Sequence, residues 1–88
     1  MARQFYEVRV ARSADKDIQA LPSEIRKRVR DAIRGLAPNP FPSGCEKLQG
    51  ERNRWRLRVG KYRIIYSVDT EQRIVRVEKI RLRSEAYR

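Results

Sequence analysis

The chain has 88 residues, enough for one small hydrophobic core, so the sequence predicts a single domain over residues 1–88. Its 22 basic residues outnumber 11 acidic ones, giving a formal net charge of +11. With no histidine and one cysteine, Cys45, the composition excludes an internal disulfide, a Cys/His zinc finger and a Ser/His/Asp catalytic triad. No apolar run reaches the ~20 residues of a membrane helix, and a lone cysteine suits a reducing compartment. We therefore expect a cytoplasmic protein with no membrane span and with Cys45 reduced in a loop.

The excess of basic residues predicts a polyanionic partner. Seventeen of the 22 basic residues are arginine, whose planar guanidinium can contact two phosphate oxygens at once. Residues 51–88 carry 12 basic and 5 acidic residues, so the second part of the chain is the more basic. The composition favours phosphate binding over the alternative of a basic surface that only keeps the protein in solution.

The first half of the chain predicts one strand and two helices. Residues 5–11 alternate apolar and polar side chains, as a half-buried strand does. Ser13 is a candidate N-cap of a short helix, which places Ala14, Ile18 and Leu21 on one stripe. A second helix begins after Pro22 and repeats apolar residues at three- and four-residue steps up to Leu36. Its other face is basic and is expected to lie in solvent.

The second half predicts a loop followed by three strands. Glycine and proline recur so often over residues 35–44 that neither a helix nor a strand is expected there. Strands are then expected over residues 55–59, 62–69 and 74–80, joined by short turns. The expected fold is α+β: a twisted antiparallel sheet of about four strands, in the order β-α-α-β-β-β, with both helices on one face and the other face open.

Gly60-Lys61 predicts a type II′ turn, which sets Arg58 opposite Arg63. Alternation along the strands then places Arg56, Arg58 and Arg63 on one side of the sheet and the apolar side chains on the other. Directly opposed cations disfavour a sheet, so their presence suggests a phosphate site. The alternative is that these arginines extend into solvent and pair with carboxylates such as Glu78, Glu85 or Asp69.

Three stretches resemble, in order and spacing, stretches of the RelE-type toxins of the RelE/ParE superfamily. They are KLQG at 47–50, WRLRVGKYRIIY at 55–66 and IRLRSEAY at 80–87. The first two are shared across the superfamily and indicate the fold. The third, which ends in Tyr87, is more typical of the RelE branch than of the gyrase-directed ParE branch.

The resemblance implies a toxin of a type II toxin–antitoxin pair, a ribosome-dependent endoribonuclease (mRNA interferase) that cleaves messenger RNA in the A site of the small ribosomal subunit. The resemblance further implies that the RNA's own 2′-hydroxyl attacks the adjacent phosphate, without a metal ion or another cofactor. By position, Arg63, Arg81 and Tyr87 match the catalytic residues of the family. We assign Arg63 to the scissile phosphate, Arg81 to the leaving oxygen and Tyr87 to stacking on a base, although on the pattern alone Tyr87 is equally consistent with a packing role.

Arg56 and Arg58 lie where relatives often carry lysine. Because arginine keeps its proton up to a pH above about 12, it is poorly suited to act as a general base, and the sequence identifies no clear agent for proton removal. We expect Arg56 and Arg58 to bind phosphate and to stabilise the charge of the transition state. Phosphate binding is also expected of Lys61 and Arg83, and Glu85 is a weaker candidate for orienting a neighbour or accepting a proton.

Two other functions are consistent with the sequence: a ParE-like inhibitor of DNA gyrase without catalysis, and a non-catalytic RNA- or ribosome-binding module. The basic charge also implies an acidic antitoxin as partner, of a kind that often folds on binding. The sequence does not determine the antitoxin contact surface, the codon preference or the oligomeric state of the free toxin.

Overall fold

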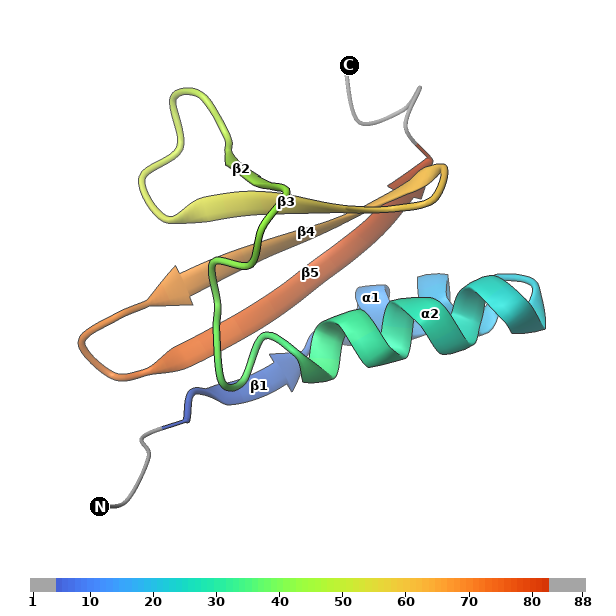
Figure 1. Ribbon diagram of the computed structural model, residues 1–88, viewed down its shortest axis with the longest axis horizontal. Helices are drawn as coiled ribbons and strands as arrows, with labels where there is room; N and C mark the ends of the chain where they lie inside the picture. The colour runs from blue at the N-terminus through green and yellow to red at the C-terminus, as the bar shows by residue number, and fades with distance from the viewer. Residues whose placement is uncertain (1–4, 83–88) are drawn as a thin grey trace.

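The computed structural model describes residues 5–82, and over this range it confirms the α+β class (Figure 1). Both expected helices and all the expected strands are present, and the two helices lie together on one side of the sheet. The elements are β1 (Glu7–Val10), α1 (Arg12–Gln19), α2 (Ser23–Arg34), β2 (Cys45–Lys47), β3 (Arg54–Val59), β4 (Tyr62–Asp69) and β5 (Ile74–Leu82).

The sheet formed by residues 5–82 has five strands rather than about four, and it is mixed rather than antiparallel. Its order is β1-β5-β4-β3-β2, and β1 runs parallel to β5 whereas the other neighbours are antiparallel. The additional strand is β2, whose three residues begin with Cys45. Cys45 therefore lies on an edge strand and not in a loop. A three-residue strand that follows a proline- and glycine-rich segment is too short to show alternation.

The hydrophobic core lies between the helices and one face of the sheet. The stripe expected on the first helix is buried, with Ala14, Ile18 and Leu21 at most 8% exposed. Helix α2 adds Val29 and Ile33, followed by Leu36 just after its end. The sheet supplies apolar side chains from its three central strands: Leu57, Val59, Ile64, Tyr66, Val68, Val75, Val77 and Ile80. Among residues 5–82, no helix is long and apolar enough to cross a lipid bilayer.

The segment between α2 and β2 packs against side chains of β3 and β4. The buried Tyr66 hydroxyl donates a hydrogen bond to the carbonyl of Pro40 at 2.8 Å. Next to it, the rings of Phe41 and Trp55 pack with centroids 4.8 Å apart and planes tilted by 59°. Burial raises the pKa of the Tyr66 phenol well above its ordinary value, and the adjacent Cys45 contributes to the same effect.

Ser13 is not the N-cap of α1. The helix begins at Arg12 after Ala11, and no side chain caps its first turn. The Ser13 hydroxyl instead donates to the carbonyl of Glu78 in β5, at 2.9 Å. The prediction was wrong because a local capping pattern does not show that a distant strand lies within reach of the same hydroxyl.

Helix α1 takes the place of a neighbouring strand along the outer edge of β5. Strand β1 pairs with β5 only as far as Val77. Beyond that point, Ser13 binds the carbonyl of Glu78 and the Asp17 carboxylate accepts the N–H of Ile80. Four residues of a helix rise about 6 Å, and two residues of a strand extend about 6.6 Å. Side chains one helical turn apart, such as those of Ser13 and Asp17, can therefore reach backbone groups two residues apart on the strand edge.

The sheet face opposite the helices is less open than expected. Ile65 points away from the helices and is nevertheless only 5% exposed. The Arg54 guanidinium also reaches from β3 to the Glu78 carboxylate on β5, at 2.7 Å, and so spans the strand between them. The pairing with Glu78 thus occurs, but it involves Arg54 and not the three arginines expected to form a phosphate site.

Candidate nucleic-acid site

The β3–β4 hairpin has the register that its turn sequence predicts. Val59 lies opposite Tyr62, and Arg58 lies opposite Arg63. Gly60 adopts a φ of 60°, and Arg73, not Lys61, is the non-glycine residue with a positive φ within residues 5–82. This combination agrees with a type II′ turn, in which only the first central residue has a positive φ.

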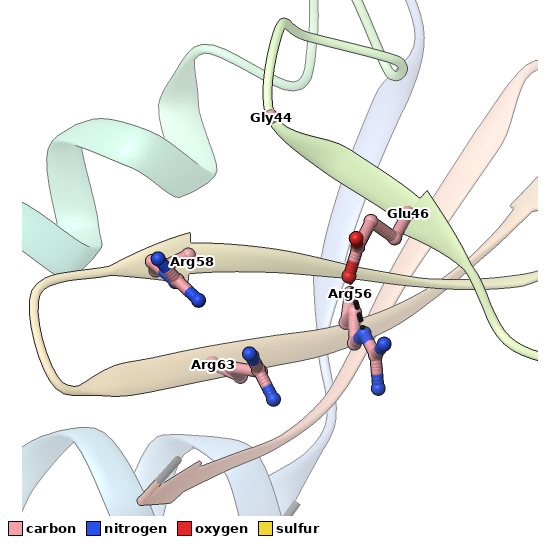
Figure 2. A pocket seen from close by; sticks show the side chains of 5 residues that line it. All are labelled: Gly44, Glu46, Arg56, Arg58 and Arg63. Atoms are coloured by element: carbon pink, nitrogen blue, oxygen red, sulfur yellow. Dashed lines mark hydrogen bonds and ion pairs between the residues drawn. The ribbon is translucent and has the colours of Figure 1, made fainter.

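Beside this hairpin is a pocket of about 360 Å³ that three arginines and one carboxylate line. Arg56 and Arg58 come from β3, Arg63 comes from β4, and Glu46 reaches the pocket from the edge strand β2. Figure 2 shows the three arginine side chains on the same side of the hairpin, with Glu46 bonded to Arg56. The structure therefore brings together the three arginines that strand alternation placed on one face.

The arginines differ in how far they are exposed. Arg63 is only 2% exposed, at the base of the pocket, whereas Arg58 is exposed at its rim. Arg58 has no hydrogen bond or ion pair with any of residues 5–82, so an anion that enters the pocket meets an accessible guanidinium. The low dielectric around a buried side chain strengthens its electrostatic interactions, and among the three arginines this applies most to Arg63.

Glu46 is the charged pocket residue that the sequence did not reveal, and Gly44 is the other lining residue that was not predicted. Oε1 of Glu46 accepts a hydrogen bond from Nε of Arg56 at 2.9 Å, and the Glu46 side chain is 61% exposed. Ion pairs of this exposure usually contribute about 0–1 kcal/mol, so a phosphate can displace the carboxylate from Arg56 at little cost. The signal that would have revealed it is the pairing of Glu46 with Arg56 across β2 and β3, and β2 itself was not anticipated.

Arg81 does not line this pocket. Its Cα is opposite Arg63 in the β4–β5 register, which extends the row Arg58–Arg63–Arg81 across three strands. Its Nη1, however, donates to Oδ2 of Asp17 and to the carbonyl of Ile80, each at 3.0 Å. The side chain is 41% exposed and lies at the α1 edge of the sheet.

The remaining predicted residues fall in the hairpin turn or beyond the described chain. Lys61 is exposed in the turn, next to the pocket strands but not among the lining residues. Arg83, Glu85 and Tyr87 lie outside residues 5–82. Within that range, no three His, Cys, Asp or Glu side chains gather in a way that could hold a metal ion.

Comparisons with known proteins agree on one family. Residues 8–87 match the family model described as the ParE toxin of the type II toxin–antitoxin system parDE. A protein of Methanocaldococcus jannaschii named as toxin RelE1 is 31% identical over 86 residues, which cover 94% of this chain and 96% of that protein.

Solved structures of toxin–antitoxin complexes show the same fold. The archaeal RelE–RelB complex from Pyrococcus horikoshii matches with a TM-score of 0.80 and 29% identity, over 89% of this chain and 94% of that chain. The RelBE2 complex of Mycobacterium tuberculosis matches with a TM-score of 0.78 and 27% identity, over 90% and 99% of the two chains. The α+β fold, the match along nearly the whole chain and the RelE relative together show that this chain is a RelE-like member of the RelE/ParE superfamily of type II toxins.

Proposed function

We propose that this chain is a ribosome-dependent endoribonuclease that cleaves messenger RNA in the A site of the small ribosomal subunit. The observation that carries the proposal is the pocket in which Arg56, Arg58 and Arg63 converge beside an exposed carboxylate. Three guanidinium groups can neutralise a phosphodiester and stabilise the additional charge of a pentacoordinate transition state. A ribosomal target would place this activity in the cytoplasm.

The chemistry needs only the RNA and side chains of the protein. The 2′-hydroxyl oxygen forms a bond to phosphorus as its proton departs, and the bond from phosphorus to the 5′-oxygen breaks. The products are a 2′,3′-cyclic phosphate and an RNA that begins with a 5′-hydroxyl, whose oxygen takes up a proton. In this scheme Arg63 binds the scissile phosphate and Arg81 stabilises the leaving oxygen, while Tyr87 stacks on a base.

Glu46 is our candidate for the group that removes the 2′-hydroxyl proton. It is the carboxylate among the described residues that line the pocket, and a carboxylate can accept a proton that the arginines cannot. Its hydrogen bond to Arg56 holds it at the pocket wall until a phosphate competes for the guanidinium. This role supplies the proton acceptor that the sequence alone did not reveal.

The direct test is to induce the chain in cells and to map the 5′ ends of messenger RNA. We expect new ends within coding regions and 5′-hydroxyl termini at those ends, and we expect an Arg63→Ala variant that remains folded to lose both. Intact messages, or new ends that carry a 5′-phosphate, would contradict the proposed cleavage.

We further propose an acidic antitoxin as the physiological partner. The related structures from P. horikoshii and M. tuberculosis are of RelE-type toxins in complex with their antitoxins. The net charge of +11 gives this chain strong attraction for an acidic segment. Co-expression with the product of the adjacent small gene should suppress new RNA ends and should yield a complex that purifies as one species.

A ParE-like inhibition of DNA gyrase is the second candidate, because the matching family model is described as a ParE toxin. A supercoiling assay with purified gyrase separates the two functions. Inhibited supercoiling with unchanged RNA would favour the gyrase inhibitor. Steeply salt-dependent RNA binding without new RNA ends would instead favour a non-catalytic RNA- or ribosome-binding module.

A further inference from the structure

The Asp17 carboxylate holds two consecutive residues of β5 with a single oxygen. Oδ2 accepts the backbone N–H of Ile80 and Nη1 of Arg81, both at 3.0 Å. The second hydrogen of Nη1 is directed to the Ile80 carbonyl, also at 3.0 Å. One end of the Arg81 guanidinium is therefore fully engaged by α1 and by its own strand.

Within residues 5–82, the opposite edge of the same guanidinium, formed by Nε and Nη2 of Arg81, has no hydrogen-bond partner. These two nitrogens present parallel N–H groups, the arrangement that binds two oxygens of one phosphate. With Nη1 fixed, the position of this edge is set before a ligand arrives.

Asp17 is itself held in place, because α1 is attached to β5 at two points. The Ser13 hydroxyl binds the Glu78 carbonyl one helical turn before Asp17, and neighbouring Ala14 and Ile18 are buried in the core. The Asp17 side chain is 29% exposed, which leaves its ion pair with Arg81 partly shielded from water. The orientation of Arg81 thus depends on a helix, not on a loop.

Arg81 is also correctly placed to extend the arginine pocket. Its Cα is paired with that of Arg63, and adjacent strands are ~4.8 Å apart. A nucleic-acid strand bound at the pocket can therefore reach Arg81 by continuing across β4 and β5.

We propose that Asp17 is a positioning residue: it fixes the Arg81 guanidinium so that the Nε–Nη2 edge binds the backbone of an RNA strand lying across the sheet. This inference rests on the proposed function, since it assumes that RNA is the ligand of the arginine face. Asp17 makes no contact with the RNA and acts only through Arg81. Without Asp17, the Arg81 side chain would have to become ordered when RNA binds. The entropy lost in that step would weaken binding.

Binding can be measured separately from cleavage. The probe is a fluorescent 2′-O-methyl oligoribonucleotide, which cannot be cleaved because it lacks the attacking hydroxyl, and Kd is obtained by anisotropy with the full chain. We expect Asp17→Ala to raise Kd by about two- to tenfold. Asp17→Asn should cause a smaller increase, because its amide oxygen can still accept from Nη1 and from the Ile80 N–H.

Two controls distinguish positioning from a structural effect. Ser13→Ala removes the other α1–β5 side-chain hydrogen bond but leaves the Asp17–Arg81 contact itself intact, so it should lower Tm while raising Kd much less than Asp17→Ala does. In an Arg81→Ala background, Asp17→Ala should no longer change Kd, because the residue through which it acts is gone.

Three results would overturn the proposal: an equal effect of Asp17→Ala with and without Arg81, an equal loss of affinity in Ser13→Ala, or an unchanged Kd in Arg81→Ala alone. Tighter binding by Asp17→Ala would do the same, because it would show that the carboxylate competes with phosphate. If the expected Kd pattern appears but the unmodified RNA is not cut on the ribosome, the nuclease proposal fails and the role of Asp17 stands.

Discussion

Arg58 of β3 and Arg63 of β4 lie directly opposite each other across the hairpin, and both line the same pocket. Opposed like charges on neighbouring strands oppose folding by a few tenths to ~1 kcal/mol. Because Arg63 is 2% exposed, this repulsion is weakly screened by solvent. An anion bound in the pocket would offset the repulsion between Arg58 and Arg63, which would explain why two arginines lie opposite each other there.

Arg58→Thr should make the protein more stable and less active. The substitution removes the repulsion and introduces a residue that favours strands, so we expect the free energy of unfolding in urea to rise by about 0.3–1 kcal/mol. Cleavage of ribosome-bound messenger should fall at least tenfold. Arg76→Thr is the matched control, since Arg76 is an exposed residue of β5 outside the pocket. It should leave cleavage nearly unchanged, and an equal loss in both variants would indicate general charge attraction instead.

Glu46→Gln separates proton transfer from binding. If Glu46 removes the 2′-hydroxyl proton, the amide should lower the single-turnover cleavage rate by about 10²–10⁴-fold. Affinity for the uncleavable oligonucleotide should stay equal or increase, because one negative charge leaves a cationic pocket. Glu24→Gln, at an exposed position of α2, serves as the control. A Glu46→Gln variant that cleaves at the normal rate would exclude Glu46 as the base.

Gly60→Ala tests the turn that sets the pocket register. A Cβ at Gly60 would meet Nη1 of Arg28 at 3.5 Å, an ordinary contact, so space is not the obstacle. The φ of 60° is the obstacle, and we expect a loss of about 1 kcal/mol in the free energy of unfolding. Gly35→Ala, at a φ of −65°, should be neutral or stabilising in the same urea titration. Equal losses in both variants would show that the turn does not depend on glycine.

The raised pKa of the Tyr66 phenol predicts how the stability of the protein changes at alkaline pH. Burial raises the pKa of this phenol in the folded protein above its ordinary value of 10.0, so the unfolded chain loses the proton first. The contribution of this phenol to the free energy of unfolding is therefore intact below pH 10, and it is lost as the pH rises from 10 toward the folded-state pKa. Between about pH 9 and pH 11, the free energy of unfolding should therefore fall more steeply in the wild type than in Tyr66→Phe. Tyr62→Phe, at a half-buried position, should keep the steep fall.

At neutral pH, Tyr66→Phe should already be about 1–2 kcal/mol less stable, because the Pro40 carbonyl loses its hydrogen-bond donor. The comparison across pH therefore concerns slopes and not absolute stabilities. Parallel slopes for the wild type and Tyr66→Phe would show that this phenol does not control the alkaline transition.

The hairpin and its arginines could be predicted because their determinants are local. Gly60 fixes the turn, the turn fixes Arg58 opposite Arg63, and alternation assigns the faces. The apolar stripes of the two helices are equally local and were also correct.

Features that depend on distant residues could not be predicted. Arg81 and Asp17 are 64 positions apart, and nothing near either residue indicates that the helix lies against the end of β5. The same reason explains Ser13, whose hydroxyl binds a strand instead of capping a helix. Strand β2 was not predicted because three residues are too few to show alternation. The Glu46–Arg56 contact, which depends on the pairing of β2 with β3, was therefore not predicted either.

The parallel pairing of Glu7 with Ile74 joins the first strand of the fold to the last. During synthesis, β1 leaves the ribosome long before β5 exists, so the nascent chain has no template on which to place it. Both α1 and the arginine row depend on β5 for their final positions. The row Arg58–Arg63–Arg81 can therefore be completed only after the residues of β5 have been synthesised, so the topology delays the assembly of this surface until late in translation.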